Sequence, residues 1–320
     1  MKGEVSWTWW QTDRGCSIRA ATLVPPGARE GAAIVVLPGR TEFIEKYEEV
    51  LDELGERGWT THILDWRGQG LSSRMAADRY MGHIDSFETY LHDLHTFFEK
   101  VVRPTSARVV ILAHSMGGHV ALRYLSERAP ADVVGLITTA PMIDVQVGPV
   151  LYPILAAASA TMCRLGLAAQ WLNGARSLEQ EADFRDNQQT SDPDRYHRMV
   201  ELQRRRPELA IGGFSAGWAR AAVASIQTLY RREVLARVHV PVCVLTAVED
   251  TRVSVKAQRD AVEWLPDARQ IELRGCKHEI LLEQDEVRAV FWEAFDAFVA
   301  TVIDQPEHQC ATQGRELRER

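Results

Sequence analysis

The chain has 320 residues, of which 46% are hydrophobic and 25% charged, and its formal net charge is −7. These values are ordinary for a globular protein with one large core, and the acidic balance excludes nucleic acid as a partner, because phosphate binding depends on Lys and Arg. The five cysteines are odd in number and show no CxxC pairing, and residues 1–15 lack an apolar stretch long enough for a signal peptide. Both features favour a cytoplasmic location.

The N-terminal part of the chain predicts three strands. Residues 4–24 indicate two strands around a turn at 13–15. Trp7 and Trp9 share one face of the first strand, and we expect them to pack in the core. The run "AAIVVLPG" that follows is continuously apolar and ends in Pro-Gly, which is typical of a buried parallel strand.

Helical and strand patterns then alternate along the chain. Helices are expected at 45–58, 85–102 and 116–130, with strand-like runs at 59–64, 107–115 and 133–141 between and after them. The alternation resumes with strand-like runs at 240–250 and 268–275 and a closing helix at 285–303. It predicts an α/β fold with a mostly parallel, doubly wound sheet.

The alternation is interrupted in the middle of the chain, where the sequence is helical and irregular. We therefore expect a core made of residues 1–145 and 233–304, with residues 146–232 as a helical insertion into that core. Residues 305–320 form a polar C-terminal tail that we expect to be frayed.

Residues 147–163, "VGPVLYPILAAASATMC", carry no charge but are too short to span a membrane and contain two prolines. They predict a buried helix or a helix of the insertion, starting after Pro153 and closed by Arg164. A helix whose apolar face contacts lipid is the alternative, and it would place the protein at the inner face of the membrane as a peripheral protein. The insertion holds eleven arginines and no lysine. Its run Arg204 to Arg206 predicts a solvated helix end, with a phosphate head group as the alternative contact.

The segment "AHSMGG" after the strand-like run at 107–115 suggests a nucleophile. A nucleophile elbow holds its serine in a strained turn between strand and helix and needs small residues two before and two after it. Ser115 has Gly117 on one side and Ala113, which adds only a methyl group, on the other. A serine after a strand can also be a simple helix N-cap.

Two further strand ends supply partners for this serine. Asp250 follows the strand-like run that begins at residue 240, and His278 lies in the loop after the run 268–275. Ser115, Asp250 and His278 follow the Ser–Asp–His chain order of a catalytic triad, in which the imidazole accepts the serine proton and the carboxylate orients the imidazole. Glu249 is the rival acid, and we interpret it as solvent-facing or as a support for its loop.

An acyl-transfer site also needs amide donors for the oxyanion. One is the N–H of Met116, directly after the nucleophile. The other should follow the strand-like run "AAIVVL", and since Pro38 has no N–H and Gly39 makes the turn, the backbone N–H of Arg40 is the expected donor.

Metal and cofactor sites are not indicated by the sequence. His92 and His95 have helical spacing but no further ligand cluster, so no metal is expected. "DWRGQGLSS" lacks the spacing of a phosphate loop, and no cofactor is expected. We interpret this loop as a border of the pocket.

The segments "LPGRTEFIEKY", "LDWRGQGLSS", "AHSMGGHVALRY", "TAVEDTRVSVKAQ" and "CKHEILLEQDEVRAVFWEAFDAF" resemble those of a bacterial lysophospholipase in the monoacylglycerol lipase-like branch of the α/β-hydrolases. The resemblance covers most of the chain. It implies an α/β-hydrolase fold, Ser115, Asp250 and His278 as the triad, Arg40 and Met116 as oxyanion donors, and an insertion that caps the active site. Pro38 and Ala113 stand where family members usually have His and Gly, which affects loop shape and substrate fit.

The function that the resemblance implies is cleavage of carboxylic esters of single-chain lipids, a lysophospholipid or a monoacylglycerol, through an acyl-enzyme on Ser115. A short-chain carboxylesterase, a proline-type aminopeptidase and a catalytically inactive binding protein are the alternatives. Dehalogenases and epoxide hydrolases are disfavoured because they place Asp at the elbow. The head group, the acyl-chain length and the oligomeric state stay open.

Overall fold

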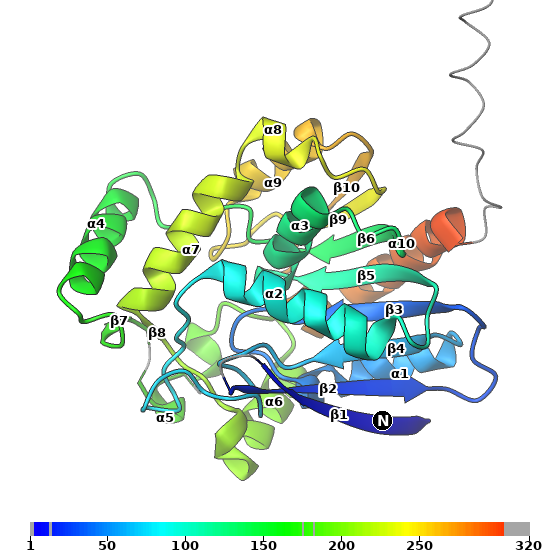
Figure 1. Ribbon diagram of the computed structural model, residues 1–320, viewed down its shortest axis with the longest axis horizontal. Coiled ribbons are helices and arrows are strands. Elements are labelled where there is room, and N and C mark those ends of the chain that lie inside the picture. The colour runs from blue at the N-terminus through cyan, green and yellow to red at the C-terminus, as the bar shows by residue number, and fades with distance from the viewer. Residues whose placement is uncertain (1–2, 13–14, 175, 182, 304–320) are drawn as a thin grey trace, which may run out of the picture.

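Eight strands form one sheet in the order β1-β2-β4-β3-β5-β6-β9-β10 (Figure 1). The computed structural model describes residues 3–12, 15–174, 176–181 and 183–303. The strands are β1 Glu4–Gln11, β2 Ser17–Val24, β3 Ala32–Leu37, β4 Thr60–Leu64, β5 Arg108–His114, β6 Val133–Thr139, β9 Val242–Ala247 and β10 Ala268–Leu273. Strand β2 pairs antiparallel with β1 and β4, and the other described pairs of this sheet are parallel. The prediction of a mostly parallel sheet is therefore confirmed.

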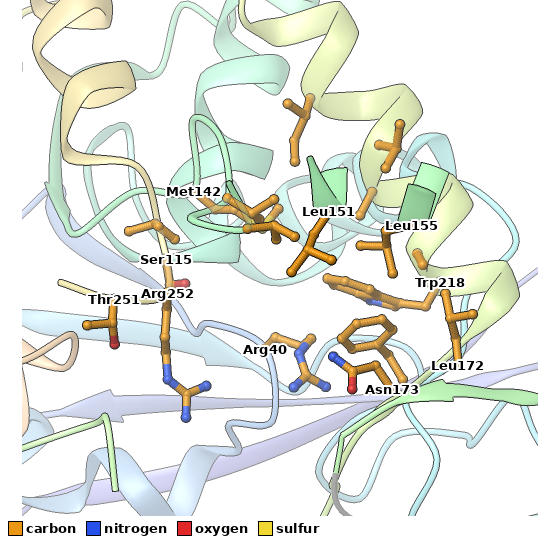
Figure 2. A pocket seen from close by; sticks show the side chains of 18 of the residues that line it. Arg40, Ser115, Met142, Leu151, Leu155, Leu172, Asn173, Trp218, Thr251 and Arg252 are labelled. Carbon is orange, nitrogen blue, oxygen red and sulfur yellow. The ribbon is translucent and has the colours of Figure 1, made fainter. Parts of the chain in front are cut away.

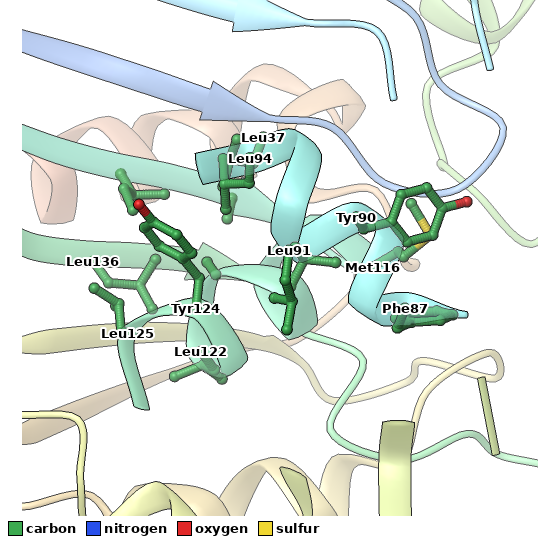
Figure 3. Close-up of a cluster of buried hydrophobic side chains, with 14 of the residues drawn as sticks. Leu37, Phe87, Tyr90, Leu91, Leu94, Met116, Leu122, Tyr124, Leu125 and Leu136 are labelled. Carbon is green, nitrogen blue, oxygen red and sulfur yellow. The ribbon is translucent and has the colours of Figure 1, made fainter. Parts of the chain in front are cut away.

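Helices cover both faces of the sheet (Figure 1). Helices α1 Glu48–Glu56 and α10 Asp285–Ile303 supply one apolar cluster, and α2 Phe87–Phe97, α3 Met116–Arg128 and α9 Val255–Trp264 supply the other. A 3₁₀ turn, Ile44–Tyr47, precedes α1, and a π-helical turn, Phe98–Val102, follows α2. Figure 3 shows side chains of α2 and α3 packed together on one face. Burial on both faces explains why the central strands are apolar throughout.

The N-terminal hairpin corrects one expectation. Strands β1 and β2 pair antiparallel as predicted, but Trp7 and Trp9 are 45% and 50% exposed, whereas Trp10 is buried and stacks on Phe97. Alternation along a strand puts Trp7 and Trp9 on the face opposite to Trp10, and at this edge strand that face is open to solvent. The guanidinium of Arg19 lies over the ring of Trp7. The turn expected at 13–15 includes residues 13 and 14, which lie outside the described residues.

Residues 146–232 lie between β6 and β9 and are called the cap below. They form α4 Leu151–Arg164, β7 Trp171–Asn173, α5 Leu178–Glu181, α6 Pro193–Arg205, β8 Phe214–Ser215 and α7 Ala216–Leu229, with short 3₁₀ turns at Phe184–Asp186 and Pro207–Leu209 and the start of α8 Arg232–Leu235. Strands β7 and β8 form a separate two-stranded sheet, and Phe214 of β8 also bridges Gly82, so no described strand of the cap joins the main sheet. Arg205 pairs with Glu201 at the end of α6, as expected of a solvated helix end, whereas Arg206 pairs with Glu45 of the turn before α1.

Helix α4 starts at Leu151, two residues before Pro153, and ends at Arg164. The predicted start after Pro153 is therefore wrong, while the predicted end is confirmed. A proline in the first turn is tolerated because its missing N–H would have no intrahelical partner there. Apolar side chains of α4 are exposed, Leu151 by 60% and Ile154 by 57%, so α4 is a helix of the cap and not a buried one. No helix among the described residues is long and apolar enough to cross a membrane, and the tail 305–320 lies outside the described residues.

Candidate active site

Ser115 occupies a strained turn between β5 and α3. Its backbone has φ 50° and ψ −114°, a conformation that a residue with a side chain rarely adopts. Hydrogen bonds on both sides hold it there: the Ser115 N–H donates to the carbonyl of Thr139 at 3.0 Å, and the Ser115 carbonyl accepts from the N–H of Met142 at 3.0 Å. The local chain therefore has the geometry of a nucleophile elbow.

The residues around Ser115 are small because backbones pass close by. A Cβ on Gly117 would lie 2.1 Å from the carbonyl oxygen of Leu37 and 2.6 Å from that of Pro38, so no side chain fits there. Ala113 is only 1% exposed and its methyl group packs in the core cluster on the α2 and α3 side of the sheet. The elbow thus accommodates alanine at the position where the resembling family has glycine.

Ser115, His278 and Asp250 are in hydrogen-bond contact, although they come from three different loops. His278 Nε2 lies 2.9 Å from Ser115 Oγ, and His278 Nδ1 lies 2.6 Å from Asp250 Oδ2. Because an ionised carboxylate only accepts hydrogen bonds, Nδ1 carries the proton and Nε2 is free to accept one from the serine hydroxyl. All three side chains are buried, and the structure brings together the three residues that the sequence singled out.

The Asp250 carboxylate is held by the backbone as well as by His278. Its Oδ1 accepts from the N–H groups of Arg252 at 2.7 Å and Val253 at 3.2 Å. Burial alone would raise the pKa of Asp250, but the hydrogen bond and charge of His278 and the two amides outweigh it, so the pKa is lowered. Glu249 instead accepts from the Gly275 N–H at 3.1 Å and supports the loop after β10.

Of the two residues expected to supply oxyanion donors, Met116 follows Ser115 in the chain and Arg40 lines the same cavity as Ser115. Met116 is the first residue of α3, where amides lack an i−4 partner. Arg40 follows Gly39, at which a Cβ would lie 3.2 Å from the Ser115 Cβ and 2.9 Å from a carboxylate oxygen of Glu42. Only glycine therefore lets the loop after β3 approach the serine this closely.

The Arg40 side chain has a role that sequence analysis missed. Its Nη1 donates to the carbonyl of Gly212 at 2.8 Å, and its guanidinium lies 5.6 Å and 5.4 Å from the ring centres of Phe214 and Trp218. These three partners belong to the cap. Arg40 therefore ties the loop after β3 to the cap beside the serine.

A buried ion-pair network beneath the site was also missed. Lys46 Nζ lies 2.6 Å from Glu42 Oε1 and 2.5 Å from Glu279 Oε2, and the Tyr47 hydroxyl donates to Glu42 Oε2 at 2.7 Å. Burial alone would raise the pKa of Glu42, but the surrounding charges and hydrogen bonds, those of Lys46 first, together outweigh burial and lower the pKa to about 2. The four-residue spacing of Glu42 and Lys46 was visible in the sequence, but their contact with the residue after His278 was not.

The same carboxylates and His114 bring three ligand-type atoms within 4.8 Å of one another. Lys46 already bonds both carboxylates, and burial lowers the pKa of His114 to about 4 and keeps its ring neutral. His114 Nδ1 lies 3.0 Å from the Thr139 carbonyl oxygen. The cluster is therefore an ion-pair network that supports the loops around Ser115.

A cavity of about 550 Å³ opens onto Ser115 and His278 (Figure 2). Its wall is largely apolar and comes from the cap. Helix α4 contributes Leu151, Ile154, Leu155 and Ala158, and α7 contributes Trp218, Ala219, Ala222, Val223 and Ile226. The cap segment that the sequence marked as uncharged thus forms one wall of the pocket at the serine.

The sheet order, the helices on both faces and the serine elbow define an α/β-hydrolase fold. Residues 28–285 match the family described as serine aminopeptidase, S33, and the chain belongs to this family of hydrolases. It is 29% identical over 289 residues to lysophospholipase L2 of Escherichia coli K12, with 83% of this chain and 79% of that protein covered.

Solved structures share the fold at lower sequence identity. A monoglyceride lipase of Saccharomyces cerevisiae is similar with a TM-score of 0.73 at 17% identity, covering 94% of this chain and 97% of that one. A thermostable carboxyl esterase of Bacillus coagulans has the same TM-score at 16% identity, covering 94% and 99%. Because one architecture carries both kinds of enzyme, the choice of substrate depends on the pocket.

Proposed function

We propose that this protein is a serine hydrolase that cleaves the carboxylic ester of single-chain lipids, either lysophospholipids or monoacylglycerols. The observation that carries the proposal is the apolar wall of α4 and α7 beside Ser115, which offers an acyl chain a place to bury. The sequence similarity to lysophospholipase L2 supports the same substrate class. No cofactor is required by this chemistry.

The contacts at the site support a double-displacement mechanism. Ser115 Oγ attacks the ester carbonyl carbon while His278 Nε2 takes the hydroxyl proton, and the amides of Met116 and Arg40 receive the oxyanion. His278 returns the proton to the glyceryl oxygen as the C–O bond breaks, which leaves the acyl group on Ser115. Water, deprotonated by His278, then releases the fatty acid. Asp250 keeps the imidazole in its required tautomer.

The outer surface of the cap suits access to lipid. Val150, Leu151, Ile154 and Leu165 are between 57% and 70% exposed and cluster on α4 and its two ends. An exposed apolar patch of this kind marks a surface that contacts other apolar material. The proposal therefore includes peripheral contact between the cap and a lipid surface.

The four described cysteines are free, which supports a cytoplasmic location.

The nucleophile is tested with a fluorophosphonate probe. Wild-type protein is expected to be labelled at Ser115, and Ser115→Ala to lose both labelling and esterase activity, the latter by about 10⁴-fold or more. Circular dichroism and a melting curve establish that the variant is folded. Esterase activity retained by folded Ser115→Ala would overturn the assignment.

The substrate class is tested with p-nitrophenyl esters of graded chain length, followed by lysophosphatidyl lipids and monoacylglycerols. Each methylene buried in the cavity contributes up to about 0.8 kcal/mol, so long chains are expected to exceed acetate in kcat/KM by well over tenfold. A preference for acetate would favour the short-chain carboxylesterase. Faster turnover of an N-terminal prolyl amide would favour the proline-type aminopeptidase.

A further inference from the structure

Arg252 stands at the rim of the cavity, two residues after Asp250. Its side chain is exposed and lines the same cavity as Ser115. Figure 2 shows its guanidinium well separated from Leu155 and Leu172 at the apolar end of the pocket. The pocket is therefore apolar at one end and carries a cation at another.

The backbone around Arg252 is fixed on both sides. The Arg252 N–H donates to Asp250 Oδ1 at 2.7 Å, and the Arg252 carbonyl accepts from the Gln146 N–H at 2.9 Å. Val145 and Val253 form an antiparallel bridge next to this bond. The side chain of Arg252 thus projects from a rigid anchor that also positions the Asp250 carboxylate.

The guanidinium of Arg252 has no acidic partner within the described part of the chain. This distinguishes it from Arg40, the other arginine that lines the cavity, whose side chain bonds Gly212 and lies over two aromatic rings. The one carboxylate of the cavity lining, Glu279, is bonded to Lys46. The cavity therefore presents an uncompensated positive charge in a protein whose net charge is −7.

We infer that Arg252 binds the phosphate group of a lysophospholipid, so that this side chain selects lysophospholipids over monoacylglycerols. The inference rests on the proposed function and names its substrate class. With the ester carbonyl at Ser115 and the acyl chain against α4 and α7, the head group is left to the rim of the cavity. A guanidinium matches phosphate oxygens with two parallel N–H donors, whereas the two free hydroxyls of a monoacylglycerol offer no charge to pair.

The test compares two substrates of equal chain length, hexanoyl lysophosphatidylcholine and monohexanoylglycerol, at concentrations where both are monomeric. Arg252→Gln is expected to lower the ratio of kcat/KM for the lysophospholipid to kcat/KM for the monoacylglycerol by about tenfold or more. A loss of this size is what removal of a charge-assisted hydrogen bond requires. The change should appear mainly in KM for the phosphate-bearing substrate, since the phosphate is remote from the reacting carbon. Arg252→Lys keeps the positive charge but loses the two parallel N–H donors. Its kcat/KM ratio should therefore lie between those of wild type and Arg252→Gln.

Arg237→Gln is the matched control. Arg237 is also an exposed arginine, but it precedes β9, whereas Arg252 follows that strand. Arg237 therefore lies at the opposite edge of the sheet and outside the cavity lining. Its substitution is expected to leave the ratio unchanged. Free sn-glycerol 3-phosphate should inhibit wild type competitively and inhibit Arg252→Gln more weakly, while glycerol should not distinguish the two proteins.

The possible outcomes separate the inference from the function on which it rests. A ratio unchanged in Arg252→Gln, or an equal loss on both substrates, overturns the phosphate subsite and leaves the lipid esterase intact. Reduced activity of the variant on anionic vesicles alone would assign Arg252 to the lipid surface and also overturn the subsite. Wild-type protein that hydrolyses acetate esters but neither hexanoyl lipid overturns both proposals.

Discussion

The ammonium nitrogen of Lys46 lies 2.5 Å from Oε2 of Glu279, the residue that directly follows His278. The same nitrogen lies 2.6 Å from Glu42 Oε1, and the other oxygen of Glu42 accepts the N–H of Gly39. One buried cation therefore joins the loop that carries Arg40 to the loop that carries His278. Its charge holds two carboxylates that would otherwise be unpaired in the interior.

Lys46→Met is expected to lower kcat by at least about tenfold with little change in KM, because the two loops lose their common anchor while the acyl-binding wall stays in place. Lys46→Arg should recover part of the loss. Lys256→Met is the matched control, since Lys256 forms an ion pair with Asp260 but its side chain is 80% exposed. Steady-state kinetics and the rate of fluorophosphonate labelling provide the measurement.

The Lys46 variant will also be less stable, because removing one partner of a buried ion pair costs several kcal/mol. Rates must therefore be referred to the folded fraction, obtained by titration with the probe. A kcat per folded molecule equal to that of wild type, or a probe reaction as fast as in wild type, would show that Lys46 serves stability alone.

Asp250→Asn is expected to reduce kcat by about 10⁴-fold, because an asparagine amide no longer fixes the imidazole tautomer with Nδ1 protonated. Glu249→Gln should cost far less, since Glu249 contacts the Gly275 N–H and not His278. Both substitutions neutralise one carboxylate in the same loop, so each controls for the other. A larger loss in the Glu249 variant would reverse the assignment of the acid.

Sequence reasoning located Ser115, Asp250 and His278 because each follows a recognisable strand, and parallel strands place their carboxyl ends at one edge of a sheet. It could not locate the contact between Lys46 and Glu279, because these two residues are 233 positions apart and belong to no shared motif. It also placed Trp7 on the wrong side: alternation shows which residues share a face, but not which face is covered.

Strand β5 and helix α4 differ in how far their sequences predict burial. The apolar run of β5 predicts burial because both faces of a central strand are covered by helices. The uncharged run of α4 does not distinguish a core helix from a helix that lines a cavity and meets solvent. That choice depends on what packs against it, which for α4 is α7.

Buried histidines make the protein less stable in acid. His119 is fully buried, with Nδ1 2.9 Å from the Met142 carbonyl oxygen and Nε2 2.6 Å from Ser225 Oγ, and burial lowers its pKa to about 3 from an ordinary value of 6.5. The unfolded chain therefore takes up a proton below pH 6.5 that the folded protein excludes, and the free energy of unfolding falls as the pH falls from 6.5 towards 3. Burial depresses the pKa of His62 and His114 to about 4, which adds to this loss.

His119→Gln is expected to reduce the slope of unfolding free energy against pH between 4 and 6 by up to about 1.4 kcal/mol per pH unit, the value for one proton. Urea unfolding at a series of pH values gives the slope, which does not depend on any constant loss of stability in the variant. His239→Gln, at an exposed histidine, is the control. A slope unchanged in the His119 variant would mean that this imidazole is protonated in the folded protein.

Helix α4 has two proposed uses, lining the cavity and contacting lipid, and different residues of α4 serve each. Ile154 is 57% exposed and lines the cavity, whereas Leu165, at the end of α4, is 70% exposed and is not part of the lining. Ile154→Asp is expected to depress turnover of long-chain esters while sparing butyrate, because a carboxylate in the wall opposes burial of the chain. Leu165→Asp should leave monomeric substrates unaffected and reduce only turnover and binding on lipid vesicles.

Both substitutions of this pair introduce the same charge at exposed positions, so differences between them report on location and not on charge. Activity is measured on monomeric and vesicle-bound substrates, and vesicle binding by sedimentation. Equal losses of Ile154→Asp on butyrate and long-chain esters would indicate that Ile154 shapes the whole site and not the acyl wall alone. Vesicle binding unaffected by Leu165→Asp would remove this end of α4 from the lipid contact, and the exposed apolar side chains of the cap would then need a different partner.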